Sequence, residues 1–138
     1  MKRNLELYFV TEIKGNSVMI NANIKGSNKN VGYIIYEYFL KPPTVHDNIL
    51  IENKTIILKF IEVHDNYKYN GFGTKLMNEF ISQFYKQNKV NSIILEARPF
   101  NSDIGLPLDI LIEFYKKFDF DLIESTHDNY KIMQFNRY

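Results

Sequence analysis

The sequence has no cysteine and no tryptophan, and its 138 residues include only six glycines and four prolines. The absence of cysteine excludes disulfides, thiolate nucleophiles and cysteine-ligated metals. The formal net charge is +1, so the chain also lacks the basic surplus that is typical of nucleic-acid-binding proteins. We therefore expect no nucleic acid among its partners.

A long hydrophobic run is missing as well. No apolar stretch approaches the roughly 20 residues that a membrane-spanning helix needs, and no signal-peptide pattern opens the chain. These absences predict a soluble protein with no membrane partner and a cytoplasmic location. His46 and His127 lie in no metal-ligand spacing and His64 is expected in a loop, so we also expect no metal.

The first half of the chain shows the alternation of half-buried β-strands. Three such segments, joined by turns at 14–16 and 26–30, predict an antiparallel meander over about 5–9, 18–24 and 31–40. Pro42 and Pro43 end this pairing, and the following loop could hold a short strand at 49–51. Residues 55–63 are almost continuously apolar, which predicts a strand buried on both faces.

The hydrophobic period changes to that of helices after Asn66. The pattern predicts a helix from Thr74 to Gln87 capped by Asn88, a buried strand, a second helix, and two closing strands around a turn at 127–129. The strand is expected over 92–97, the second helix over 108–118, and the closing strands over 120–124 and 130–135. The length suits one domain over residues 1–138, and the order of elements predicts an α/β (α+β) fold with a mostly antiparallel sheet.

The segment between the buried strand and the first helix carries the most specific signal. Gly71 and Gly73 have no Cβ, so a ligand can approach the backbone N–H groups there closely. The following helix directs its unpaired N–H groups and positive dipole end at the same place, which suits a pyrophosphate. A tight strand-to-helix turn is the alternative explanation. The spacing fits neither a P-loop nor the dinucleotide-binding fingerprint.

Lys68, Gly71 and Gly73 resemble the acyl-CoA motif of the GCN5-related N-acetyltransferase (GNAT) family, with Lys68 in place of the usual Arg or Gln. Two further segments are similar to the family in the same order. Leu95-Glu96-Ala97-Arg98-Pro99-Phe100-Asn101 resembles the ribosomal-protein N-terminal acetyltransferases, and Phe114-Tyr115-Lys116-Lys117-Phe118-Asp119-Phe120 resembles the Phe-Tyr-x-Lys-x-Gly-Phe signature. The resemblance implies a GNAT-like sheet with two main helices after the glycine loop.

The resemblance also implies an activity, which is transfer of an acetyl group from acetyl-CoA to a primary amine. The acceptor would be a lysine or an N-terminus of a protein or peptide. A backbone N–H near Val63 would polarise the thioester carbonyl. The implied acyl-CoA contacts lie at the strand end, in the glycine loop and at the downstream asparagine: Ile61, Val63, Lys68, Tyr69, Asn70, Gly71, Phe72, Gly73, Thr74 and Asn101.

Two residues acquire catalytic roles from the resemblance. Tyr115 would protonate the leaving thiolate as a general acid, although it also lies on the apolar stripe of its helix and could be a core aromatic. Glu96 would act as the base that neutralises the amine, although it could instead form an ion pair with Arg98 on the same strand face. Glu62 is a second candidate base, and a solvated residue at a strand end is the alternative.

Besides Lys68, the chain departs from the family at Asp119, which replaces the common Gly, and in two connections. Only a short turn separates Glu12 from Ser17, where the family has two helices that help to wall the acceptor site, and the loop over 102–107 is enlarged. The acceptor side is therefore expected to be open or to be completed by a second subunit, as in a homodimer. Acetylation of a small amine remains an alternative function. A further alternative is a catalytically inactive module that binds acyl-CoA or a partner protein.

Overall fold

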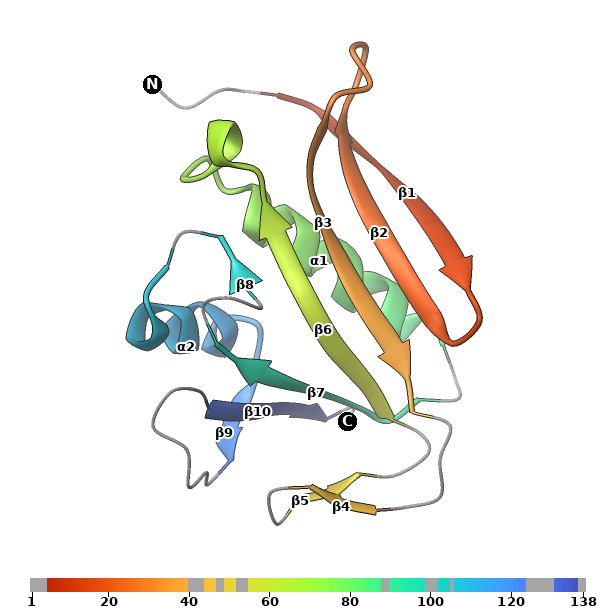
Figure 1. Ribbon diagram of the computed structural model, residues 1–138, viewed down its shortest axis with the longest axis vertical. Helices are drawn as coiled ribbons and strands as arrows, with labels where there is room; N and C mark the ends of the chain where they lie inside the picture. The colour runs from red at the N-terminus through yellow and green to blue at the C-terminus, as the bar shows by residue number, and fades with distance from the viewer. Residues whose placement is uncertain are drawn as a thin grey trace.

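The computed structural model describes residues 5–39, 44–46, 49–51, 55–87, 90–98, 102–104, 106–123 and 131–136. The chain begins with the expected meander of β1 (Leu7–Lys14), β2 (Ser17–Ile24) and β3 (Asn30–Tyr38), drawn in red to orange in Figure 1. In β2 the buried residues alternate strictly, because one face packs on the core and the other does not. The predicted strands and their antiparallel order are confirmed.

The remaining elements follow in the order that the sequence predicts, with two additions. They are β4 (Thr44–His46), β5 (Ile49–Ile51), β6 (Thr55–Val63), the 3₁₀ turn η1 (Asp65–Tyr67), α1 (Phe72–Tyr85), β7 (Ser92–Ala97), β8 (Ser102–Asp103), α2 (Leu108–Lys116), β9 (Asp121–Ile123) and β10 (Lys131–Asn136). The strands β4 and β8 were not predicted, because two or three residues carry no readable period. The strand β4 pairs with β5 in a separate two-stranded sheet, whereas β8 joins the main sheet.

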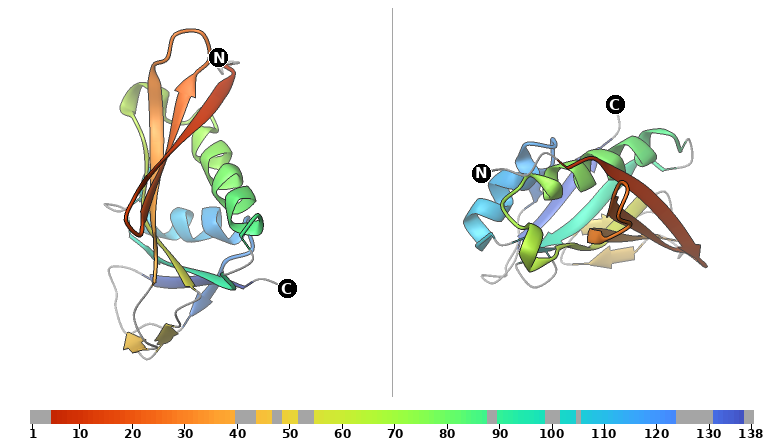
Figure 2. Two further views of the ribbon diagram at one scale, coloured as in Figure 1. Left: turned by 90° about the vertical axis from the view of Figure 1, so that its right-hand side faces the viewer. Right: turned by 90° about the horizontal axis from the view of Figure 1, so that it is seen from above.

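The main sheet has the strand order β1-β2-β3-β6-β7-β10-β9, with β8 paired to β6. All neighbours in it are antiparallel except β6–β7 and β6–β8. Both helices lie on the same side of this sheet (Figure 2). The opposite face carries no helix among the described residues, although Ile94 and Ile132 are buried on it.

The core lies between the helices and the covered face of the sheet. The side chains of α1 that enter it are fully buried, and they meet alternate residues of β2, β3, β6 and β7. These α1 residues are Phe72, Leu76, Met77, Phe80 and Phe84. A second, small cluster of Ile94 and Ile132 lies apart from this core. No helix among the described residues is both long and apolar enough to cross a membrane.

The parallel strands β6 and β7 separate halfway along their length. They pair only where Thr55–Leu58 runs beside Ser92–Leu95. Beyond Leu58 a β-bulge makes Lys59 an extra residue opposite β3, and the next paired residues of β6, Ile61 and Glu62, lie beside β8 instead. Because a bulge bends its strand and increases the local twist, it accounts for the divergence.

Two expectations need correction. The strand β6 is not buried on both faces, since Lys59 and Phe60 are exposed, and the reason is that no described helix covers the second face. The first helix begins at Phe72 rather than Thr74 and ends at Tyr85, because Gly71 already ends the loop as its N-cap. The expected cap at Asn88 and the expected turn at 127–129 lie outside the described residues.

Candidate functional site

The candidate site lies where β6 ends and α1 begins. After Val63 the chain forms η1, and a short loop from Lys68 leads to Gly71. The side chain of Asn70 holds this loop together, since its Nδ2 donates hydrogen bonds to the carbonyl oxygens of Tyr67 (3.2 Å) and Lys68 (2.9 Å). The side-chain amide of Asn70 therefore links the start of the loop to its end.

Gly71 is required by the backbone conformation. Its φ is +80°, and as N-cap it supplies no side-chain hydrogen bond to the helix. The N–H groups of the first turn of α1 are thus left for another partner, and the helix dipole favours a negative one. A Cβ built on Gly71 would meet no atom within 4 Å, so this position faces open space in which a phosphate can lie.

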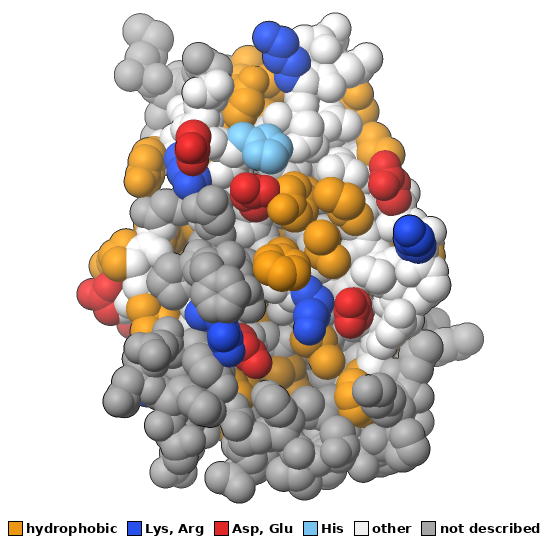
Figure 3. Space-filling model, in the orientation of Figure 1, with side chains coloured by type: hydrophobic (Ala, Val, Ile, Leu, Met, Phe, Trp, Pro, Cys, Tyr) orange, Lys and Arg blue, Asp and Glu red, His pale blue; other side chains and the backbone are white. Residues whose placement is uncertain are grey.

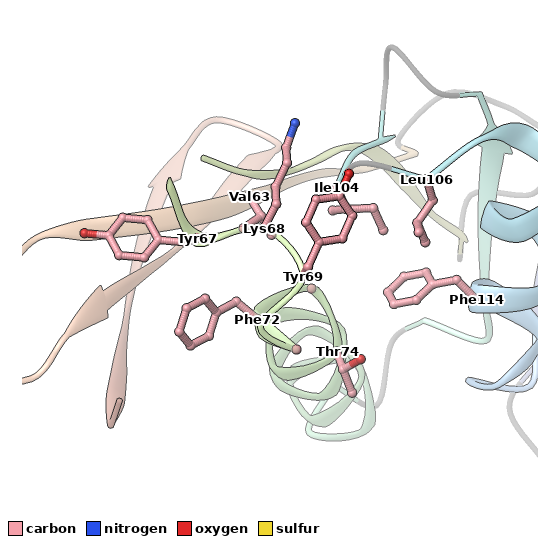
Figure 4. Close-up of a pocket in the computed structure, with 11 residues that line it drawn as sticks. Val63, Tyr67, Lys68, Tyr69, Phe72, Thr74, Ile104, Leu106 and Phe114 are labelled. Atoms are coloured by element: carbon pink, nitrogen blue, oxygen red, sulfur yellow. The ribbon is translucent and has the colours of Figure 1, made fainter. Parts of the chain in front are cut away.

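A small cavity of about 130 Å³ opens beside this loop (Figure 4). Seven predicted acyl-CoA contacts line it: Val63, Lys68, Tyr69, Gly71, Phe72, Gly73 and Thr74. Four further lining residues are not predicted by the sequence, and they are Tyr67, Ile104, Leu106 and Phe114. Two of these come from the enlarged loop before α2, whose path no local pattern predicts. Phe114 could have been predicted as a lining residue, because it directly precedes Tyr115 in the signature segment.

Two predicted contacts do not line the cavity, and a third lies outside the described residues. The side chain of Ile61 is 1% exposed and belongs to the core. Asn70 uses its amide to shape the loop, and Asn101 lies outside the described residues.

The charge near the loop comes from Lys68. Its Nζ is 3.0 Å from Asp65 Oδ1, and its side chain is 13% exposed whereas that of Asp65 is 92% exposed. In Figure 4 the Lys68 side chain points away from the first turn of α1. An anion at this turn would therefore meet backbone N–H groups rather than the Lys68 ammonium.

The backbone N–H of Val63 points away from β3. The next residue, His64, donates its N–H to the carbonyl oxygen of Val31 in β3 at 2.8 Å. Because successive N–H groups of a strand point to opposite sides, the N–H of Val63 points away from β3, toward the gap between β6 and β7. In the structure β8 pairs with β6 on this side, and donation from this N–H to a negatively charged oxygen stays a prediction.

A polar network holds the end of β6 in place. The Nδ2 of Asn30 lies within 3.3 Å of four oxygen atoms from β2 and β3, which fixes the amide so that its Oδ1 accepts. This Oδ1 is 2.7 Å from His64 Nε2, and it accepts a hydrogen bond when Nε2 carries a proton. His64 was expected only as a loop residue, and the structure makes it a link between β3 and the loop.

The two candidate bases have different surroundings. Glu96 forms an ion pair with Arg98, as its alternative explanation predicts, and the two side chains are 31% and 22% exposed. Glu62 is half-buried and lies between Ile61 and Val63, which face the core, so it projects from the helix-free face. Neither carboxylate lines the cavity.

Tyr115 lies in the core at 1% exposure, with its ring 5.4 Å from that of Phe114 and 5.9 Å from that of Phe120. The cavity is lined by Phe114 rather than by Tyr115. The position agrees with the core-aromatic alternative, and the role of general acid stays a prediction. Among the residues that the structure describes, no three His, Asp or Glu side chains gather as metal ligands.

Solved structures similar to this chain include acetyltransferases. A GNAT-family acetyltransferase from Staphylococcus aureus Mu50 has a TM-score of 0.60 and 18% identity over 88% of this chain and 68% of its own. Arabidopsis thaliana NAA60 in complex with acetyl-CoA has a TM-score of 0.61 and 15% identity over 90% of this chain and 77% of its own. NAA60 has also been solved with a bisubstrate analogue. At these identities the similarity establishes the fold.

No curated protein is similar enough in sequence to match the chain. The sequence profile of the acetyltransferase (GNAT) family, however, matches residues 3–120. That match includes the glycine loop, the strand that carries Glu96 and the Phe-Tyr segment of α2. The chain therefore belongs to the GNAT acetyltransferase family.

Proposed function

We propose that this protein transfers an acetyl group from acetyl-CoA to a primary amine of a protein or peptide. The observation that carries the proposal is the uncapped first turn of α1 behind a left-handed Gly71, with open space where a side chain would stand. This arrangement offers backbone donors to a pyrophosphate. NAA60, which has a similar fold, has been solved with acetyl-CoA.

The reaction follows from the groups at the end of β6. The neutral amine attacks the thioester carbonyl, a C–N bond forms, and the N–H of Val63 donates to the oxygen that becomes negative. The C–S bond then breaks, the thiolate of CoA leaves and takes up a proton, and the amine nitrogen loses one. We assign to Tyr115 the donation of a proton to the thiolate. Glu96 or a water molecule accepts the proton from the amine.

The acceptor must lose a proton before it can attack. For a lysine with a pKa near 10.4 this costs about 4.6 kcal/mol at pH 7, whereas for an α-amine with a pKa near 7.8 it costs about 1 kcal/mol. An N-terminal amine can therefore react with little help from a base. Because Arg98 already engages the Glu96 carboxylate, the structure favours an α-amine within the protein and peptide class.

The helix-free face of the sheet favours an extended acceptor over a small metabolite. Val10 and Phe60 are each 40% exposed on this face, and Glu62 projects from it near the end of β6. Figure 3 shows hydrophobic side chains gathered near the middle of the face with charged side chains around them. Small-molecule sites are concave and enclose most of their ligand, whereas Val10 and Phe60 lie on an exposed part of this face.

A thiol-release assay with a mixed panel of peptides and small amines tests the proposal directly. We expect CoA release with peptides and a mass gain of one acetyl group on the acceptor. Turnover of a polyamine or amino sugar with no peptide activity would favour the small-molecule alternative. If calorimetry and thermal shift detect no acetyl-CoA binding at millimolar concentration, the enzyme function is wrong.

A further inference from the structure

The strand β8 occupies the gap that opens between β6 and β7. Residues Ser102 and Asp103 pair in parallel with Ile61 and Glu62, directly beyond the point where β7 leaves β6. A strand edge in a protein interior needs hydrogen-bond partners for its N–H and C=O groups. In this structure β8 supplies partners at the end of β6.

The pairing uses the side of β6 on which the acyl donor is expected. His64 N–H bonds to β3, so the backbone groups of Ile61 and Val63 face the opposite side, where β8 lies. Neighbouring strands are about 4.8 Å apart. A thioester that is to accept a hydrogen bond from Val63 must stand at this distance from β6, in the space that β8 now fills.

One described side chain anchors β8 at this place. Ile104 follows β8 directly and is 7% exposed, and it lines the cavity beside the glycine loop. Its Cγ2 would be 3.6 Å from a Cβ built on Gly73 in the first turn of α1. The anchor therefore rests on the helix end that is expected to bind the pyrophosphate.

We propose that β8 is a strap that closes the acyl-donor site. In the closed state β8 pairs with β6, and in the open state it leaves this edge so that the N–H of Val63 faces the thioester. The inference rests on the function proposed above, and it adds that acetyl-CoA binds only the open state. The apparent affinity is then reduced by the fraction of molecules that are open.

A disulfide across the strap tests this directly, because the chain has no cysteine of its own. Glu62 and Asp103 are partners in the parallel register, and a spacing of about 4.8 Å lies within the Cα–Cα range of a disulfide. We expect the oxidised double variant Glu62→Cys/Asp103→Cys to bind no acetyl-CoA by calorimetry. Reduction with a phosphine should restore binding. Binding rather than turnover is measured, since Glu62 is a candidate base.

A second disulfide far from the site is the matched control. Ser17 and Glu37 are register partners of β2 and β3 at the far end of these strands from the glycine loop. The variant Ser17→Cys/Glu37→Cys should bind acetyl-CoA equally well when oxidised and when reduced. Mass spectrometry confirms that each disulfide has formed.

The variant Ile104→Ala gives an independent answer. If Ile104 only contacted the ligand, its truncation would weaken acetyl-CoA binding. If it anchors the strap, truncation favours the open state and lowers the dissociation constant several-fold. The two explanations predict opposite changes in the dissociation constant for acetyl-CoA. Ile104→Ala therefore tests the strap even if the cysteine variant folds poorly.

The failure of the strap can be distinguished from the failure of the proposed function. Equal binding by the oxidised and reduced strap variant, or weaker binding by Ile104→Ala, overturns the strap while the acetyl-CoA site stands. Absence of acetyl-CoA binding in the unmodified protein and in Ile104→Ala overturns the proposed function, and the strap with it.

Discussion

At the scale of single residues, Gly71 and Gly15 form a natural pair for comparison. Both have a left-handed backbone, with φ of +80° and +64°, and a Cβ on either would meet nothing within 4 Å. The valine variants of both therefore carry a similar backbone strain of about 1–2 kcal/mol. We expect Gly71→Val to abolish the rise in melting temperature on addition of acetyl-CoA. Gly15→Val, in the β1–β2 turn, should keep that rise.

This comparison separates ligand binding from stability. A ligand that binds only the native state raises its stability by mass action, so the rise in melting temperature reports binding. If Gly71→Val still shows the full rise, the phosphate does not lie against this turn and the acyl-CoA site is elsewhere.

Glu96 distinguishes a catalytic from a structural carboxylate. Since Arg98 holds it in an ion pair, we expect Glu96→Gln to lower the melting temperature slightly and to leave the pH–rate profile unchanged. The loss of stability should be no more than about 1 kcal/mol, because the pair is partly exposed. A rate loss concentrated at low pH, where neutral amine is scarcest, would instead identify Glu96 as the base.

The variant Tyr115→Phe tests whether Tyr115 is the general acid. The variant keeps the ring that packs against Phe114 and Phe120, so the fold and acetyl-CoA binding should survive. A phenol with a pKa near 10 is protonated at neutral pH, and a positioned acid typically contributes about 10²- to 10⁴-fold. We expect turnover to fall within this range and to recover in part with an acyl donor whose thiol is more acidic. A wild-type rate in the chemical step would make Tyr115 a core aromatic only.

At the scale of elements, the close approach of β3 to β6 positions the end of β6. A Cβ on Gly32 would lie 2.2 Å from the carbonyl oxygen of Glu62, a distance that no real Cβ adopts. Gly32→Ala must push the strands apart beside Val63, and we expect a loss of about 3 kcal/mol in the free energy of unfolding. Chemical denaturation measures it.

Gly73→Ala is the control for this prediction. Its Cβ would make ordinary contacts of 3.6 Å or more, and alanine is favoured over glycine in a helix by roughly 0.5–1 kcal/mol. This variant should be as stable as the parent or slightly more so. If Gly32→Ala were equally stable, the strand packing described here would be wrong.

At the scale of the whole molecule, hydrogen bonds between tyrosines and glutamines join α1 to the meander. The hydroxyl of the buried Tyr36 donates to Gln83 Oε1 at 3.3 Å, and Tyr38 donates to Gln87 Oε1. Burial, and next the neighbouring Tyr38, raise the pKa of Tyr36 above its ordinary value of 10.0. The folded state therefore keeps this proton at a pH at which the unfolded state has lost it.

The raised pKa of Tyr36 makes the stability of the fold depend on pH in the alkaline range. Below about pH 10 both states hold the proton and Tyr36 makes no pH-dependent contribution. Above it the unfolded state is favoured, by up to about 1.4 kcal/mol per pH unit. We expect Tyr36→Phe to make the loss of stability between pH 10 and 11 shallower than in the parent, as measured by chemical denaturation. Equal slopes would contradict the burial of this hydroxyl.

Local spacing determined much of this protein from the sequence alone. Alternation set which residues of β2 face the core, helical spacing placed α1 and α2 within two residues, and the glycine pair marked the loop at the start of α1. The Glu96–Arg98 pair was also foreseeable, because residues two apart in a strand lie on the same face. All of these depend on the geometry of one element.

Only the tertiary structure decided which distant segments meet. A bulge makes β6 diverge from β7, and a long connection places β8 beside β6. The packing of α2 buries Tyr115. The exposure of Lys59 and Phe60 has the same origin, since whether β6 is buried on one side or two depends on which elements the rest of the chain places over it. The period of a single strand or helix carries no information about such contacts, and they determine whether the site is open to a ligand.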